Sequence, residues 1–360
     1  MKRHILSCAL LGLCSLSWAH DFSATTADGQ KLYFNITDSK SSAVCVTFEG
    51  PAASRHASNC SGEISIPAKV KFNNKVYSVT AIDSKAFAGA GSLTSITLPS
   101  GLTKIGDFAF EGCANLDKII FPGNEVQFGE GVFFGCTAIR SVTLGSDWTK
   151  VNLQMFRWSD KLTELTIPAK LKQLRNLKDL KALENVQVDP NNASYMSSEG
   201  LLYTKDGKTL LACPRGRQGK VKVSEGTEVV YQGAFIDCPR VSAVDLPTSL
   251  KMISYREFSR MKNLENITMR AEEPIKTAVK TGQEVFLFKV ASANVTLSVP
   301  KKQAKAYKNA MTAEAGEYTE LQGIFGKQGN GNNLTTVPMT LHADEVLPVK
   351  AIKGVKKFED

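Results

Sequence analysis

The chain has 360 residues, of which 42% are hydrophobic and 22% charged, and its formal net charge is +9. This length ordinarily predicts two domains. The basic residues are scattered and do not interleave with aromatic residues as in single-strand binders, so the charge does not predict a nucleic-acid partner. It favours a solvated basic surface, with attraction to anionic glycans or host surfaces as the weaker alternative.

Residues 1–19 have the pattern of a secretory signal peptide. Lys2 and Arg3 precede an apolar core, and small residues end the segment at Ala19. We predict cleavage after Ala19, which leaves a mature net charge of +9 − 2 = +7. The apolar core is too short to span a bilayer, and no other stretch approaches a transmembrane helix. Lipid anchoring at Cys14 is the less favoured alternative, because a leucine precedes that cysteine.

Two of the cysteines that follow the signal segment lie in the predicted N-terminal cap. Cys45 and Cys60 flank a stretch rich in Ser, Ala and Pro. Export permits disulfides, so this pair is a candidate for one. The chain contains no CxxC motif, so we predict no metal knuckle.

From residue 79 onward, phenylalanine recurs at a step of 23 residues. The six positions that share this column are Phe87, Phe110, Phe133, Phe156, Phe235 and Phe258. Four further columns are apolar, and in the second unit they hold Ile105, Leu116, Ile119 and Phe121. A fixed step of this kind predicts a solenoid, in which each rung presents the same apolar face to its neighbour.

Each unit predicts two short strands and a turn. The segment Ser95–Leu98 alternates polar and apolar residues, as half-buried strands do, and Pro99 ends it. A second extended piece holds Ile105, and Asp107–Cys113 predicts a helical turn that packs its phenylalanine inward. The predicted fold class is therefore α/β, a leucine-rich repeat solenoid of 23-residue rungs with a parallel sheet. Cys113, three residues after the phenylalanine, is predicted to be a small buried thiol rather than half of a bridge.

The pattern LxxIxLPxxLxxIxxxAFxxC resembles the BspA-like (Treponema-type) leucine-rich repeat of host-associated bacteria. Residues 79–170 and 227–272 carry it directly, and 171–189 fit a shortened rung. Members of this family are mostly surface or secreted proteins, and some are adhesins. The resemblance is specific for the fold and weak for the activity.

The resemblance also implies how the chain is organised. A hairpin is expected between the repeats, and a strand–helix cap is expected after them. The last residues contain a Gly/Asn-rich linker, GKQGNGNN, and a tail without an assigned fold. The predicted segments are a signal peptide at 1–19, a β-rich N-terminal cap at 20–78, the solenoid at 79–272 with a hairpin insert at about 190–223, a C-terminal cap at 273–325, and a linker and tail at 326–360.

Alternation along the strands predicts which side chains face solvent. The exposed rows are rich in small polar residues and poor in aromatics, so solubility of the sheet and ligand binding are equally good interpretations. The candidate ligand contacts in these rows are Lys118, Glu164, Thr166, Asn185, Gln187, Asp245, Asn266 and Thr268. Outside the rows, Trp148 replaces a leucine and is predicted to lie in the core, whereas Trp158 is predicted to be exposed and is a second candidate.

The sequence contains no convincing catalytic pattern. The histidines of the mature chain, His20, His56 and His342, lie outside the repeats, so a nucleophile there has no base. The acids Glu164 and Asp245 are at least three rungs apart, too far for a glycosidase pair. We therefore predict no enzyme, no cofactor and no metal site.

These observations favour an exported binding protein at a bacterial surface. Its predicted role is adhesion or capture of an extracellular protein or glycan, because solenoids present an extended surface. The alternative is a non-catalytic structural component of the cell envelope.

Overall fold

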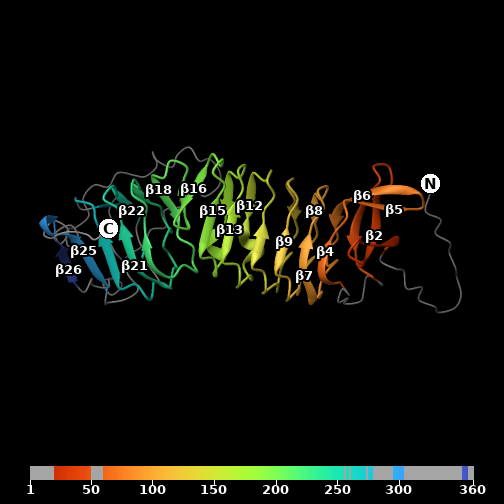
Figure 1. Cartoon of the computed structure of the whole chain (residues 1–360), viewed down its shortest axis with the longest axis horizontal. Coiled ribbons are helices and arrows are strands. Elements are labelled where there is room, and N and C mark those ends of the chain that lie inside the picture. The colour runs from red at the N-terminus through yellow and green to blue at the C-terminus, as the bar shows by residue number, and fades with distance from the viewer. Residues whose placement is uncertain are drawn as a thin grey trace.

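The computed structural model describes residues 20–49, 60–254, 257–258, 261–272, 275–278, 295–303 and 351–355. They form an elongated solenoid whose rungs stack along the long axis, with the N-terminal strands at one end and the last strands at the other (Figure 1). The predicted signal peptide and the Gly/Asn-rich linker lie outside the described residues.

Each rung contributes one strand that carries the Ile96 column, which we call a front strand. Isoleucine or another apolar residue of this column points into the core. The described front strands pair in parallel within three separate sheets, β4 to β11, β13 with β15, and β19 to β26, and Ile96 for example pairs with Ile119. The front strands are β4 (Ser61–Ser65), β7 (Ser92–Thr97), β9 (Lys118–Ile120), β11 (Ser141–Thr143), β13 (Glu164–Ile167), β15 (Asn185–Val188), β19 (Gly219–Lys222), β21 (Val241–Leu246), β23 (Asn266–Met269), β25 (Thr296–Pro300) and β26 (Ala351–Val355).

The second strand of each rung carries the Ile105 column and is called a rear strand. The N-terminal cap joins this side, because antiparallel strands β1, β2 and β3 lead to a parallel pairing of β3 with β6. The strands on this side are β1 (Phe22–Thr25), β2 (Lys31–Asp38), β3 (Ala43–Thr47), β5 (Lys69–Phe72), β6 (Lys75–Ile82), β8 (Lys104–Ile105), β10 (Gln127–Phe128), β12 (Lys150–Asn152), β14 (Gln173–Arg175), β16 (Tyr195–Ser198), β17 (Leu201–Thr204), β18 (Thr209–Ala212), β20 (Val229–Val230), β22 (Met252–Ser254) and β24 (Lys276–Ala278).

The phenylalanine column forms the spine of the core, as the repeat predicts. All six side chains are buried. Phe110 stacks between Phe87 and Phe133, with ring centroids 5.0 and 5.3 Å away. Cys113, Cys136 and Cys238 are buried thiols, and the first two donate to carbonyls of the preceding rung. The column therefore holds small or apolar buried residues, as expected.

The region predicted as a hairpin insert contains more than a hairpin. Strands β16, β17 and β18 form an antiparallel meander, but β18 also pairs in parallel with β20. Strand β19 pairs in parallel with β21 on the front. Residues 209–222 thus supply a further rung, and the insertion proper is the β16–β17 hairpin.

The α/β label is wrong. Among the described residues the helical elements are three short 3-10 turns, η1 (Leu153–Phe156), η2 (Leu177–Asp179) and η3 (Lys301–Gln303). The phenylalanine turns are closed by local hydrogen bonds such as Cys113 N to Phe110 O, at 3.2 Å, without propagating into a helix. The helical C-terminal cap is not supported: β25 leads into η3, and the rest of that predicted helix lies outside the described residues.

No bond joins the sulfurs of the candidate disulfide in this structure. Cys45 and Cys60 are both buried. The Cys45 thiol lies 3.5 Å from Asp83 Oδ2 and donates to it, and burial raises its pKa to about 12. Cys60 directly precedes the front strand β4, which pairs in parallel with β7. The two cysteines thus belong to different sides of the first rung, and the parallel front sheet begins within the predicted cap.

None of the helices in the described part of the chain is long and apolar enough to cross a membrane.

Candidate functional site

Strand pairing is interrupted between two consecutive rungs in the middle of the solenoid. We call residues 125–147 rung three and residues 148–170 rung four. In the described residues, no strand ladder joins β10 to β12 at the rear or β11 to β13 at the front. The hydrophobic core nevertheless continues across the junction, because Phe133 stacks on Phe156 at 5.2 Å.

The turns confirm this interruption. The amides of Phe108, Phe110 and Gly112 donate to rung-three carbonyls at 2.8, 2.9 and 2.8 Å. In the part of the chain that the structure describes, the corresponding rung-three amides donate to no carbonyl of rung four. The junction is therefore held by core packing and a few polar contacts instead of a continuous backbone ladder.

Trp148 lies at the interruption. It occupies the position of Leu102 in the rung pattern and is buried. Its ring packs against Phe121 and Phe128, at centroid distances of 5.0 and 5.7 Å. The indole is larger than leucine, and the rear strands on either side of it, β10 and β12, do not pair. Nearby, the carboxylate of Glu125 accepts a hydrogen bond from the Thr149 amide at 2.9 Å. In the next rung the acceptor is a main-chain carbonyl instead of a side chain, namely the carbonyl of Thr149.

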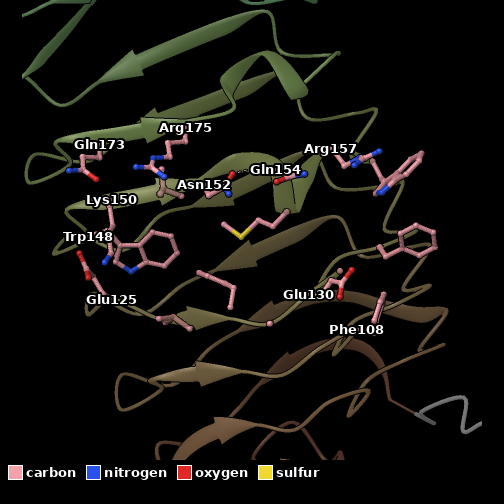
Figure 2. A pocket seen from close by; sticks show the side chains of 18 residues that line it. Phe108, Glu125, Glu130, Trp148, Lys150, Asn152, Gln154, Arg157, Gln173 and Arg175 are labelled. Atoms are coloured by element: carbon pink, nitrogen blue, oxygen red, sulfur yellow. Dashed lines mark hydrogen bonds between the residues drawn. The ribbon is translucent and has the colours of Figure 1, made fainter. Parts of the chain in front are cut away.

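A groove of about 1100 Å³ opens over this junction (Figure 2). We call it the side groove. Its turn side carries two exposed aromatic side chains, Phe134 and Trp158, which meet edge to face at 5.5 Å. Their exposed fractions of 45% and 41% stand out, since large apolar side chains are usually buried in a core. Phe108 of the preceding rung extends the aromatic edge.

Glycine at position 131 makes room for Phe108. Gly131 has φ +56°, and a Cβ there would collide with the Phe108 ring. Phe108 itself has φ +54°, in the left-handed region that side chains rarely adopt. The backbone on the rung-three side of the groove is therefore shaped to hold this ring in place.

The rung-four side of the side groove is basic. Lys150 faces Gln173, and Asn152 faces Arg175, in the parallel pairing of β12 with β14. All four side chains are exposed and line the groove. Arg157 lies over the Trp158 ring, 4.9 Å from its centroid, in a cation–π contact.

The opposite wall is acidic, but one of its acids is already bonded. The carboxylate of Glu125 accepts from the Thr149 hydroxyl as well as from its amide. These hydrogen bonds, the hydroxyl first, lower the pKa of Glu125 below its ordinary value. Glu130 lines the same wall. The groove thus combines aromatic rings, amides and charges of both signs.

The front-face residues predicted as ligand contacts are spread along the sheet. Glu164 pairs with Asn185 and Thr166 with Gln187 on adjacent strands, while Lys118 lies two rungs before Glu164. Asn185 is half-buried because its side chain accepts from Arg217 Nη1 at 2.8 Å. Further along, Asn266 is exposed and Thr268 half-buried. These residues make an open strip.

The prediction that Asp245 faces solvent is wrong. Its side chain is buried, and its carboxylate accepts from Arg270 Nε at 2.8 Å. Lys220 of the preceding rung adds an ion pair at 3.3 Å. Strand alternation does place Asp245 outward, but Arg270, just after the next front strand, folds back over it.

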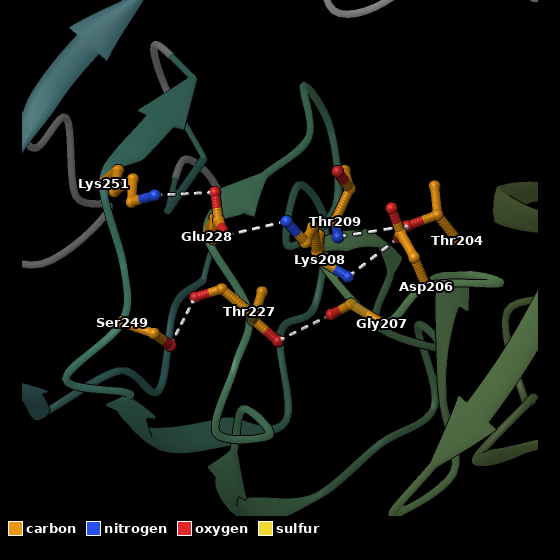
Figure 3. A network of polar contacts seen from close by, with 9 residues as sticks. All are labelled: Thr204, Asp206, Gly207, Lys208, Thr209, Thr227, Glu228, Ser249 and Lys251. Carbon is orange, nitrogen blue, oxygen red and sulfur yellow. Dashed lines mark hydrogen bonds and ion pairs between the residues drawn. The ribbon is translucent and has the colours of Figure 1, made fainter.

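A second cluster of charges lies on the rear side of the later rungs (Figure 3). Glu228 is held between Lys208 at 3.3 Å and Lys251 at 2.9 Å, and these bonds lower its pKa. Beside them, the Thr204 hydroxyl donates a hydrogen bond to the Asp206 carboxylate. The charges neutralise one another on an exposed surface, where such pairs add little stability. We read this cluster as a contact between rungs.

Sequence reasoning found Trp158 but missed its neighbours. Phe134 follows the core Phe133 directly, in a column where the other units carry Ala88, Glu111, Arg157, Ile236 and Ser259. A large aromatic in a variable column, whose described members are exposed or half-buried, was the available signal. Lys150 and Arg175 give no such signal, since exposed cations are common on rear strands.

The stacked rungs with an open side groove define a leucine-rich repeat scaffold. The chain belongs to the BspA type leucine-rich repeat family, whose model matches six copies over residues 64–178 and 218–310. The match begins within the predicted cap, in agreement with the position of β4. No curated protein matches the sequence.

Solved structures of low identity are similar to this chain. The pneumococcal vaccine antigen PcpA is 18% identical over 81% of this chain and 96% of its own, with a TM-score of 0.41. A leucine-rich cell surface protein from Faecalibacterium prausnitzii is 17% identical over 81% and 93%, with a TM-score of 0.37. A leucine-rich repeat protein from Eubacterium ventriosum is 17% identical over 75% and 76%, with a TM-score of 0.42.

Proposed function

We propose that this protein is an exported binding scaffold that captures an extracellular protein or glycan at a bacterial surface through its side groove. One observation carries the proposal. Two exposed aromatic side chains, Phe134 and Trp158, border a groove that is also lined by exposed cations, at a place where the strands of neighbouring rungs do not pair. Aromatic and arginine side chains are the residues that most often dominate binding energy. The family membership supports a repeat scaffold for protein binding.

The test compares the two candidate surfaces on the same protein. The chain from residue 20 onward is screened against extracellular matrix proteins and a glycan array. Trp158→Ala with Phe134→Ala is expected to weaken any specific binding by about tenfold or more, since two hot-spot contacts are lost. The front-face variant Lys118→Ala, Glu164→Ala, Gln187→Ala serves as the control. Loss of binding in the front-face variant alone would move the site to that face.

Export is part of the proposal and has its own test. If the signal segment is removed as predicted, the protein recovered from the cell surface or medium begins at His20. Mass spectrometry of its N-terminal peptide reports this directly. An acylated Cys14 at the N-terminus would replace secretion with lipid anchoring.

A further inference from the structure

The two walls of the side groove differ in net charge. Residues 148–181, which include rung four and most of the shortened rung after it, contain eight basic and three acidic residues, 8 − 3 = +5. Rung three contains one basic and three acidic residues, 1 − 3 = −2. The groove therefore lies at a boundary between a basic wall and a weakly acidic one, and the basic wall is the larger.

The basic groups of that wall are available to a ligand. Lys150 and Arg175 are exposed and form no ion pair with another described residue. On the acidic wall, Glu125 is hydrogen-bonded to Thr149 and also interacts electrostatically with Lys150. A ligand with acidic groups therefore gains attraction from the basic wall, and one of the two acids opposite is already satisfied.

The spacing of these groups matches an extended peptide. Residues two apart on a strand lie about 6.6–6.8 Å apart on the same face, which is also the spacing of alternate side chains in an extended chain. Lys150 pairs with Gln173 and Asn152 pairs with Arg175. The two cations, Lys150 and Arg175, therefore lie on neighbouring strands and are offset by two residues along the strand direction. Gln173 adds an amide that can both donate to and accept from a peptide main chain. At the turn side, Trp158 and Phe134 offer an apolar contact.

We infer that the side groove binds an extended acidic peptide segment of a partner protein, which lies along β12 and β14. This rests on the proposed function and narrows its ligand class. Acidic side chains of the segment pair with Lys150 and Arg175, and an apolar side chain packs against Trp158 and Phe134. Recognition by an extended segment uses alternate side chains for specificity.

The probe is a random linear peptide library selected against the immobilised chain from residue 20 onward. The expected result is enrichment of sequences with Asp or Glu at alternate positions beside an apolar residue. Their affinity, measured by fluorescence polarisation, is expected to fall about tenfold in Lys150→Glu, Arg175→Glu, because two attractive contacts become repulsive. Added salt is expected to weaken binding to the unaltered chain.

The matched control is Lys69→Glu, Lys71→Glu. These two lysines are exposed, lie two residues apart on β5 and make the same change in net charge. Binding is expected to change by less than about twofold, since the substituted charges lie far from the groove in the N-terminal cap. Thermal unfolding of both variants checks that the fold persists.

Three results overturn the inference. If no selected peptide depends on Lys150 and Arg175, the groove does not bind this class of segment. If glycans of the array bind instead and depend on those residues, the occupant is a carbohydrate, and the proposed function stands without the peptide. If neither peptides nor glycans nor matrix proteins depend on the groove, the proposed function fails as well.

Discussion

The indole Nε1 of Trp148 donates to the main-chain oxygen of Asn124 at 2.8 Å and thereby ties rung four to the residue that directly precedes rung three. The same side chain fills a leucine position of the repeat, and the strands on either side of it, β10 and β12, do not pair. One residue thus both holds the junction together and keeps its rear side open.

Trp148→Leu tests this role. The substitution restores the usual residue but removes a hydrogen bond and part of a buried ring, so we expect a loss of about 1–3 kcal/mol in unfolding free energy. Amide exchange in Gln127–Phe128 and Lys150–Asn152 is expected to slow as the rear strands approach. Ligand binding is expected to fall although Trp158 and Arg175 are unchanged. Unaltered exchange and binding would mean that Trp148 is not the spacer.

Phe110→Ala tests the spine of the core. Phe110 is fully buried between two stacked rings, so truncation is expected to cost about 3–5 kcal/mol of unfolding free energy. Chemical denaturation measures this. Phe134→Ala is the control: its ring is 45% exposed, so a loss of less than about 1 kcal/mol is expected. Equal losses in the two variants would contradict the packing described above.

Most of the fold could be predicted because the repeat is a packing constraint. Phe110 and Ile119 must be buried in the same way on every rung, and the structure confirms both positions. The turn around Phe110 was overestimated as helical, because an inward aromatic at a fixed step does not distinguish a tight turn from a helix. The hairpin region concealed a rung, since β18 does not follow the 23-residue step: Leu210 pairs with Val230, and 230 − 210 = 20. The front strand β19 does keep the step, because Val221 pairs with Val244 and 244 − 221 = 23.

The candidate site was less predictable for a physical reason. A repeat pattern describes what rungs share, whereas the side groove arises where one rung differs from its neighbours. Trp148 was correctly placed in the core, but burial alone does not reveal that a larger ring interrupts a ladder. Asp245 was misplaced because its partner Arg270 lies one rung later, and strand alternation does not report contacts between rungs.

Asp245→Asn tests the buried ion pair. The side chains of Asp245 and Arg270 are 7% and 9% exposed, so removing the carboxylate leaves a buried guanidinium without full compensation. We expect a loss of about 3–5 kcal/mol in unfolding free energy, with Glu225 retaining part of the interaction with Arg270 at 2.9 Å. Lys220→Ala removes the exposed partner of Asp245 and is expected to cost less than about 1 kcal/mol. Small losses of unfolding free energy of similar size in both variants would instead support the prediction that Asp245 faces solvent.

Glu257 is a titratable group in a column of apolar residues. It precedes the core Phe258 and is buried, and its carboxyl accepts from the amides of Gly233 at 2.5 Å and Phe235 at 3.2 Å. The equivalent positions in the other units are Ala86, Ala109, Val132, Met155 and Ala234. Burial raises the pKa of Glu257 from 4.5 to about 8, against the opposing effect of the amide hydrogen bonds.

The pH dependence of stability follows from this shift. Between pH 4.5 and about 8 the folded state keeps the Glu257 proton and the unfolded state has lost it. The protonated group therefore makes its full contribution to the unfolding free energy below pH 4.5, and this contribution is lost as pH rises through about 8. Over this range the unfolding free energy falls by up to about 1.4 kcal/mol per pH unit. Glu257→Gln keeps a neutral acceptor for the two amides and removes the titration. Denaturation between pH 5 and 8 is expected to give a falling unfolding free energy for the unaltered chain, and a difference between the chain and the variant that grows with pH. A constant difference across this range would show that Glu257 is ionised in the folded state.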